Sequence, residues 1–148
     1  MQEILVAVDG SKQSEQVVDS AIDLAKRTSL PILLVYVMKD VREEPEAVKE
    51  FEKVEHFHDA YANYLKEIGD SVTGRMTERI EKSNISCRTI VELGNPAERI
   101  LKIADDSKSS FVVVGLKGLH GVERIRSLGS VSRRIVENAH CPVMVVPS

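Results

Sequence analysis

The sequence predicts an α/β protein with a doubly wound, five-stranded parallel sheet in the order 3-2-1-4-5 and helices on both faces. Short apolar runs, rich in β-branched residues, alternate along the chain with longer segments whose apolar residues recur at helical spacing. Such an alternation requires right-handed crossovers between parallel strands. The chain has 148 residues, an ordinary size for one domain, so we expect residues 1–148 to form a single unit.

The beginning of the chain predicts a strand, a helix and a second strand. Residues 4–8 are a continuous apolar run that is too short for a helix. Ser11 can cap the helix that follows, and this helix ends near Thr28. Residues 31–37 are apolar at consecutive positions, which is typical of a parallel strand covered on both faces.

A charged stretch, residues 41–82, predicts a loop and then one long helix that forms the second crossover. Pro45 suits a first helical turn, and the apolar residues beyond it keep roughly helical spacing. Gly69 and Gly74 interrupt this pattern and are the positions at which a kink is expected.

The second half of the chain predicts three more strands and two helices. Residues 85–91 alternate polar and apolar side chains, as an edge strand exposed on one side does. A helix begins at Pro96, and residues 111–114 form another buried strand. The last helix follows Gly129, and residues 142–146 form the last strand.

The stretch after residues 111–114 is the candidate functional segment. The strand ends at Gly115, further glycines stand at 118 and 121, and Gly129 opens the last helix. Glycine permits unusual backbone conformations and the close approach of a ligand. A helix N-terminus presents unpaired N–H groups and the positive end of the helix dipole, so this segment predicts an anion site with phosphate as its natural ligand.

Positive charge is concentrated on this glycine segment although the whole chain is acidic. Between Gly115 and Arg134 there are five Lys or Arg residues and only Glu123 as an acid, whereas the net charge of the chain is −3 at pH 7. The local charge favours a phosphate ligand; the alternative is that these basic residues form a solvated surface. The acidic balance of the whole chain argues against a nucleic-acid-binding protein.

The predicted strand order brings two distant segments together. Asp9 follows the first strand and Gly115 ends the fourth, and the chain reverses direction between these two strands. Ligands of open α/β sheets bind at such a switch point. Simpler roles stay open: Asp9 as a turn residue, Ser130 as a helix N-cap, and Gly129 as a residue that eases tight packing.

The sequence contains no recognisable catalytic constellation. Neither the P-loop pattern nor G-x-G-x-x-G occurs, which argues against a Walker-type NTPase and a dinucleotide-binding enzyme. No general base or metal-binding carboxylate pair is identifiable beside the glycine segment, so we assign no catalytic residue and favour binding over turnover. His56 and His58 face different sides of a helix and predict no metal site, and Cys87 and Cys141 are expected to be reduced thiols.

Three segments of the chain resemble the universal stress protein family. They are ILVAVDGS at residues 4–11, the Gly94-Asn95-Pro96 turn with its helix, and the C-terminal Gly-x-x-Gly, Gly-Ser-Val and CPVMVV segments. The similarity spans essentially the whole chain. It implies a doubly wound α/β fold, usually a homodimer, and in one branch a G-x2-G-x9-G-[ST] motif that holds the ribose and phosphates of ATP.

The resemblance implies a set of ATP-binding residues, with Mg²⁺ or Mn²⁺ as an ion that can accompany the nucleotide. The residues expected to contact the triphosphate and ribose are Gly115, Gly118, Gly129, Ser130 and Val131. The residues expected to border the adenine and ribose are Ala7, Asp9 and Val37. Ten residues separate Gly118 from Gly129, one more than in the family's motif.

The resulting hypothesis is an ATP-binding regulatory module that acts in stress response as a homodimer and passes its state to a regulated protein. The strand Val143–Val146 should lie at a sheet edge and is strongly apolar, so we expect it to pair with a second copy. The alternatives are a structural or regulatory dimer that binds no nucleotide, and a slow ATPase. We expect a cytoplasmic protein, because no run approaches the roughly 20 apolar residues of a membrane span and the chain opens directly with a strand.

Overall fold

The computed structural model describes residues 2–39, 57–116 and 128–147, and these residues form five strands and four helices that alternate as the sequence predicts. In chain order they are β1 (Ile4–Val8), α1 (Ser14–Thr28), β2 (Ile32–Met38), α3 (Phe57–Lys82), β3 (Cys87–Leu93), α4 (Pro96–Ser107), β4 (Phe111–Gly115), α5 (Ser130–Asn138) and β5 (Val143–Val146).

The strands form one parallel sheet in the order β3-β2-β1-β4-β5, which confirms the predicted doubly wound fold. β1 is the central strand, since Ile4 pairs both with Ile32 of β2 and with Phe111 of β4. Every residue of β2 is buried, as expected for a parallel strand covered on both faces.

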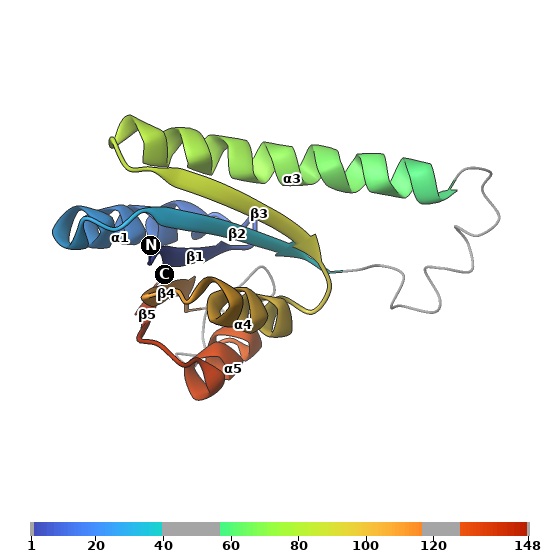
Figure 1. Cartoon of the computed structure of the whole chain (residues 1–148). Helices are drawn as coiled ribbons and strands as arrows, with labels where there is room; N and C mark the ends of the chain where they lie inside the picture. The colour runs from blue at the N-terminus through green and yellow to red at the C-terminus, as the bar shows by residue number, and fades with distance from the viewer. Residues whose placement is uncertain (1, 40–56, 117–127, 148) are drawn as a thin grey trace.

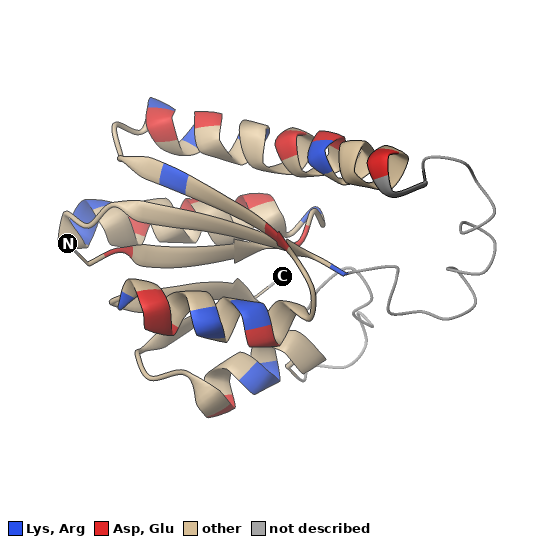
Figure 2. Ribbon diagram, turned by 45° about the vertical axis from the view of Figure 1, so that its right-hand side comes forward, with Lys and Arg blue, Asp and Glu red and all other residues tan. Residues whose placement is uncertain are grey.

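Helices cover the two faces of the sheet in pairs. Figure 1 shows α1 and α3 on one face and α4 and α5 on the other. Successive side chains of a strand point to opposite faces, so Ile4, Val6 and Val8 pack in the cluster under α1 and α3. Leu5 and Ala7 pack in the cluster under α4 and α5. Most charged residues lie on the helices, and the strands between them are largely uncharged (Figure 2).

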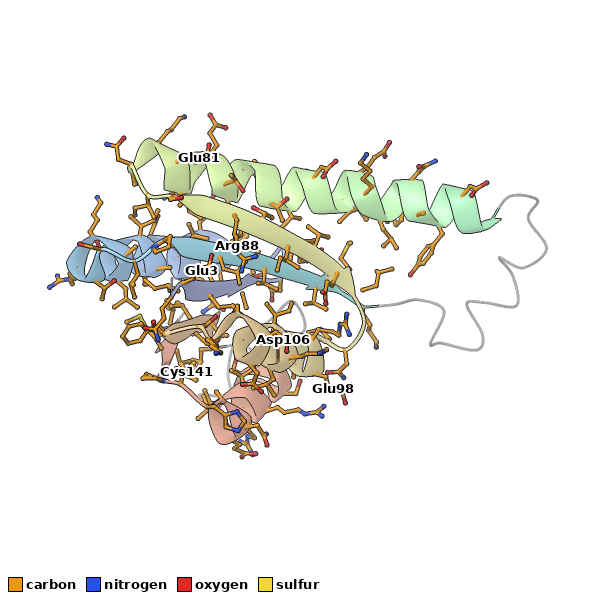
Figure 3. All side chains as sticks on the ribbon, viewed as in Figure 1. Glu3, Glu81, Arg88, Glu98, Asp106 and Cys141 are labelled. Carbon is orange, nitrogen blue, oxygen red and sulfur yellow. The ribbon has the colours of Figure 1, made fainter. Side chains whose placement is uncertain are left out.

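The strand β3 lies at one edge of the sheet, which confirms the prediction from its polar alternation. Arg88 of β3 donates from Nε and Nη2 to the two carboxylate oxygens of Glu3, with both distances 2.7 Å. Glu3 immediately precedes β1, so this ion pair spans β2 (Figure 3). The exposed guanidinium discourages another strand from pairing at this edge.

The turn between β1 and α1 shows that the prediction of a Ser11 cap was wrong. The helix begins at Ser14 with Gln13 as its N-cap, and no side chain caps it. Asp9 Oδ1 accepts hydrogen bonds from the Ser11 N–H at 2.9 Å and from the Ser14 hydroxyl at 3.3 Å. This Asx turn delays the start of the helix, and the Ser11 hydroxyl is buried with no hydrogen-bond partner in the described part of the chain.

The long helix α3 continues through both of its glycines without a break (Figure 1). A Cβ added at Gly69 would lie 2.9 Å from Cγ1 of Val91, so glycine permits the close approach of α3 to β3. The expected helix start at Pro45 and the side chains of His56 and His58 lie outside the described residues. None of the helices described is both long and apolar enough to cross a membrane.

Candidate functional site

The carboxyl ends of β1 and β4 lie side by side in the middle of the sheet. Val6 of β1 pairs with Val113 of β4, so Asp9 and Gly115 follow neighbouring strands at the same end. From these ends α1 turns to one face of the sheet and α5 to the other. The predicted switch point is therefore confirmed, and it is where open α/β sheets bind ligands.

The first turn of α5 leaves backbone donors available. Gly129 is the N-cap, with φ −64° and ψ 165°, and it has no side chain with which to cap the helix. Within the described residues, the N–H groups of Ser130, Val131 and Ser132 donate to no backbone carbonyl. Ser130 is exposed and is the first helical residue, so it does not have the N-cap role that the sequence left open. These three N–H groups can bind an anion.

The N–H of Gly129 itself is engaged within the chain. It donates to the carbonyl of Leu116 at 2.8 Å, and Leu116 is the residue immediately after β4. The Ser132 hydroxyl donates to the carbonyl of Gly115. These two hydrogen bonds connect residues 115–116 with the start of α5. They keep the first turn of α5 beside the carboxyl end of β4.

Apolar side chains at the carboxyl ends of β1 and β2 lie on the same face of the sheet as α5. Val37 is buried, and Ala7 is partly buried in the same cluster under α4 and α5. Val131 packs against that cluster from α5. Ala7 pairs with Val35, two residues before Val37, so both side chains lie near the carboxyl ends of their strands. The structure brings together the apolar residues and the helix N-terminus that the sequence predicted for one site.

Asp9 has the turn role that the sequence left open, because its carboxylate accepts from Ser11 and Ser14. Tyr36 lies beside this turn, and the sequence did not predict it as a neighbour. A Cβ built on Gly10, which has φ +81°, would lie 3.7 Å from the Tyr36 hydroxyl. Burial raises the pKa of Tyr36, and the charge of Asp9 and the nearby Tyr64 raise it further. The phenol therefore keeps its proton at neutral pH. Its position inside an apolar run offered no signal in the sequence.

Part of the predicted site lies outside the described residues. Gly118 belongs to this part, as do three of the basic residues of the glycine segment, Lys117, Arg124 and Arg126. Arg134 is described and donates to Glu98 of α4 at 3.0 Å.

The described residues contain no cluster of three or more His, Cys, Asp or Glu side chains that could hold a metal ion. Cys87 and Cys141 are free cysteines, as expected. Burial is the main cause that raises the pKa of each thiol, so both are protonated at neutral pH.

A cavity of about 470 Å³ lies apart from the switch point, between α3 and the carboxyl ends of β2 and β3. Met38, Leu65 and Val91 contribute apolar side chains, and Arg99 and Glu92, which pair at 2.8 Å, contribute charge. The sequence did not predict this cavity. In the sheet, β1 lies between the strands that border this cavity and β4, and the cavity adds nothing to the site described above.

Comparison with known families and proteins shows what the chain is similar to. The Usp model, described as the universal stress protein family, matches residues 1–147. Among curated proteins, universal stress protein YxiE of Bacillus subtilis (strain 168) is 31% identical over 144 residues, which cover 97% of both chains.

Solved structures share the fold. The hypothetical protein MJ0577 superposes with a TM-score of 0.82 at 24% identity, over 99% of this chain and 96% of that one. The universal stress protein from Archaeoglobus fulgidus in complex with dAMP has a TM-score of 0.67 at 21% identity, over 99% and 98% of the two chains. A universal stress protein in complex with cAMP has a TM-score of 0.71 at 21% identity, over 98% and 96%.

Proposed function

Because the chain belongs to the universal stress protein family, we propose that it binds an adenine nucleotide where β1 and β4 end. The observation that carries the proposal is the first turn of α5, whose three N–H groups donate to no backbone carbonyl of the described residues and lie beside the end of β4. ATP, alone or with Mg²⁺ or Mn²⁺, is the ligand that the family resemblance implies. The dAMP and cAMP complexes of two proteins with this fold support an adenine nucleotide.

The polarity of the site matches that of a nucleotide. The phosphates would lie at the N-terminus of α5, where the helix dipole and the Ser130 hydroxyl favour negative charge. Gly115, Gly118, Gly129 and Val131 would line the path of the phosphates and ribose. The adenine would lie toward Ala7 and Val37, whose side chains offer an apolar surface, and the ribose would lie near Asp9.

The proposed role is regulatory binding in stress response, in the cytoplasm, with the bound state passed to a partner protein. A homodimer formed through β5 is part of this proposal. The carbonyl of Pro142 accepts from Val112 of β4 and that of Val146 from Leu116, just after β4. The alternation of a parallel ladder therefore directs the N–H and C=O groups of Val143 and Val145 to the open edge. Met144 is 37% exposed on this strand. An apolar strand with an open edge favours pairing with a second copy.

Calorimetric titration with ATP, AMP and adenosine tests the binding proposal. We expect ATP to bind to wild type and Gly129→Val to abolish binding, because a β-branched side chain would obstruct the approach to the first turn of α5. Gly74→Val is the matched control, since a Cβ there meets nothing within 4 Å. Circular dichroism should show that both variants are folded. Undiminished ATP affinity in folded Gly129→Val would contradict the proposal, and no binding by wild type would favour the non-binding alternative.

Sedimentation at micromolar concentration tests the dimer. We expect wild type to sediment as a dimer and Val145→Lys to sediment as a monomer, because a lysine on an edge strand discourages strand pairing. A matched lysine variant on the other edge, Thr89→Lys in β3, should leave the dimer intact. A monomeric wild type, or a dimer that withstands Val145→Lys, would contradict the proposed interface.

A further inference from the structure

One carbonyl oxygen joins three elements that are far apart in the sequence. The carbonyl of Val146, the last residue of β5, accepts a hydrogen bond from the Leu116 N–H at 2.9 Å. The same oxygen accepts a second bond, also at 2.9 Å, from Nε2 of Gln13, the N-cap of α1. Leu116 is the residue at which the chain leaves β4 and enters the glycine segment. Gln13 therefore ties the start of α1 to the start of that segment.

The side chain of Gln13 also lies where a side chain at position 115 would begin. A Cβ added at Gly115 would lie 2.8 Å from Oε1 and 3.0 Å from Cδ of Gln13, and 3.3 Å from Cγ2 of Val17. A distance below 3.0 Å requires something to move, and the Gln13 amide, as the far end of a flexible side chain, is the group that can move. Moving it disturbs its bond to the Val146 carbonyl, whereas the Val17 contact needs a shift of only a few tenths of an ångström. The amide of Gln13 thus occupies the space that a Cβ at position 115 would need.

We propose that Gln13 is a positioning residue for the nucleotide site and that it, not a ligand, requires glycine at position 115. Its amide donates to the Val146 carbonyl, which also accepts from the Leu116 N–H. These bonds fix the position of Leu116, the first residue after β4. Leu116 in turn accepts from Gly129 and keeps the first turn of α5 in place. The first part of this inference rests on the proposed nucleotide binding. The second part concerns the fold alone and stands independently of it.

The chemistry of glutamine suits this position. The bond to a carbonyl oxygen needs a donor, which a glutamate carboxylate lacks, and the orientation of the amide is determined by that bond. A methionine keeps the length and approximate volume of the side chain but donates nothing. Gln13→Met therefore removes the donor with little change in packing.

A double-mutant cycle in thermal stability tests the requirement for glycine. We expect Gly115→Ala to lower the melting temperature and Gln13→Ala to lower it less, since Gln13 is partly exposed. Adding Gln13→Ala to Gly115→Ala should restore more than half of the melting temperature that Gly115→Ala loses, because the colliding amide is gone. Additive losses in the double variant would overturn the inference. This cycle needs no nucleotide, so it decides the point even if wild type binds none.

Titration of the same proteins with ATP and adenosine tests the positioning role. We expect Gln13→Met to weaken ATP about five- to tenfold and to leave adenosine within about twofold, because the phosphates would contact the first turn of α5, which Gln13 positions through Val146, Leu116 and Gly129. A structural role without positioning would lower the melting temperature and change neither affinity, and that result would overturn the inference. An equal loss for ATP and adenosine would overturn it as well. If wild type bound neither ligand, the proposed function would fail, and the stability cycle would still report on Gln13.

Discussion

The first turns of α4 and α5 differ in whether their backbone N–H groups find partners within the described part of the chain. Both helices follow a parallel strand and lie on the same face of the sheet, but α4 satisfies its own N-terminus. The Asn95 side chain accepts from the N–H of Glu98 at 3.1 Å, and Pro96 removes one donor. Glu98, labelled in Figure 3, places an acidic residue in the first turn, where the helix dipole favours negative charge. In α5 the N-cap is Gly129, and the first turn contains no acidic residue.

This difference in capping indicates that, of the two N-termini, that of α5 is the one available to bind a ligand. A single Asn, Asp, Ser or Thr at the N-cap would stabilise α5 at no cost to its backbone, since the extended φ and ψ of Gly129 suit any residue. The N-terminus of α4 has a capping side chain, and that of α5 has none among the described residues. The acidic residue in the first turn of α4, Glu98, also pairs with Arg134 of α5. Of these two helices, only α5 lacks both a capping side chain and an acidic residue in its first turn.

The largest expected effect comes from making α5 resemble α4. Gly129→Asp would add an N-cap carboxylate that accepts from the first turn and repels the phosphates. We expect ATP affinity to fall at least about a hundredfold, about 2.7 kcal/mol, while the melting temperature stays level or rises slightly. The matched control is Asn95→Asp, which adds the same charge to the N-cap of α4 and should leave ATP affinity within about twofold. Equal loss in both variants would mean that overall charge, and not the first turn of α5, governs binding.

A smaller effect is expected when only the hydroxyl at the start of α5 is removed. Ser130→Ala should weaken ATP about ten- to a hundredfold, because a hydrogen bond to a charged phosphate is worth roughly 1.5–3 kcal/mol. The melting temperature should barely change, since Ser130 is exposed and does not cap the helix. Calorimetry and thermal melting of one sample measure both quantities. A lowered melting temperature with unchanged ATP affinity would remove Ser130 from the site.

The smallest effect on ATP affinity is expected at α4, whose N-terminus is capped by Asn95. Here the stability should change and the affinity should not. Asn95→Ala removes the side chain that accepts from Glu98 and should cost about 1 kcal/mol of unfolding free energy. ATP affinity should stay within about twofold, because α4 would contribute no donor to the phosphates. Denaturant unfolding with calorimetric titration checks both expectations. A marked loss of ATP affinity would show that the first turn of α4 belongs to the binding site.

The elements of the fold were predictable because each depends on local pattern. The buried strand at residues 31–37, the edge strand with its polar alternation and the helix that begins at Pro96 are all present. The strand order is the one expected of the predicted doubly wound sheet, and it places Asp9 and Gly115 at the carboxyl ends of neighbouring strands. The Ser11 cap was wrong because the Asp9 carboxylate competes for the same turn, and local propensity alone does not rank two such side chains.

The sequence by itself determined the alternation of strands and helices and the switch point, because these follow from residue type and spacing along the chain. The structure decided that Gly129, and not Ser130, is the N-cap of α5. Only the tertiary structure decided what Gly115 and Gly129 do. Gly115 makes room for the Gln13 amide, and the Gly129 N–H is already bonded to Leu116. Gln13, Gly115 and Val146 are separated by up to 133 residues along the chain, so their contact arises only when the sheet has assembled.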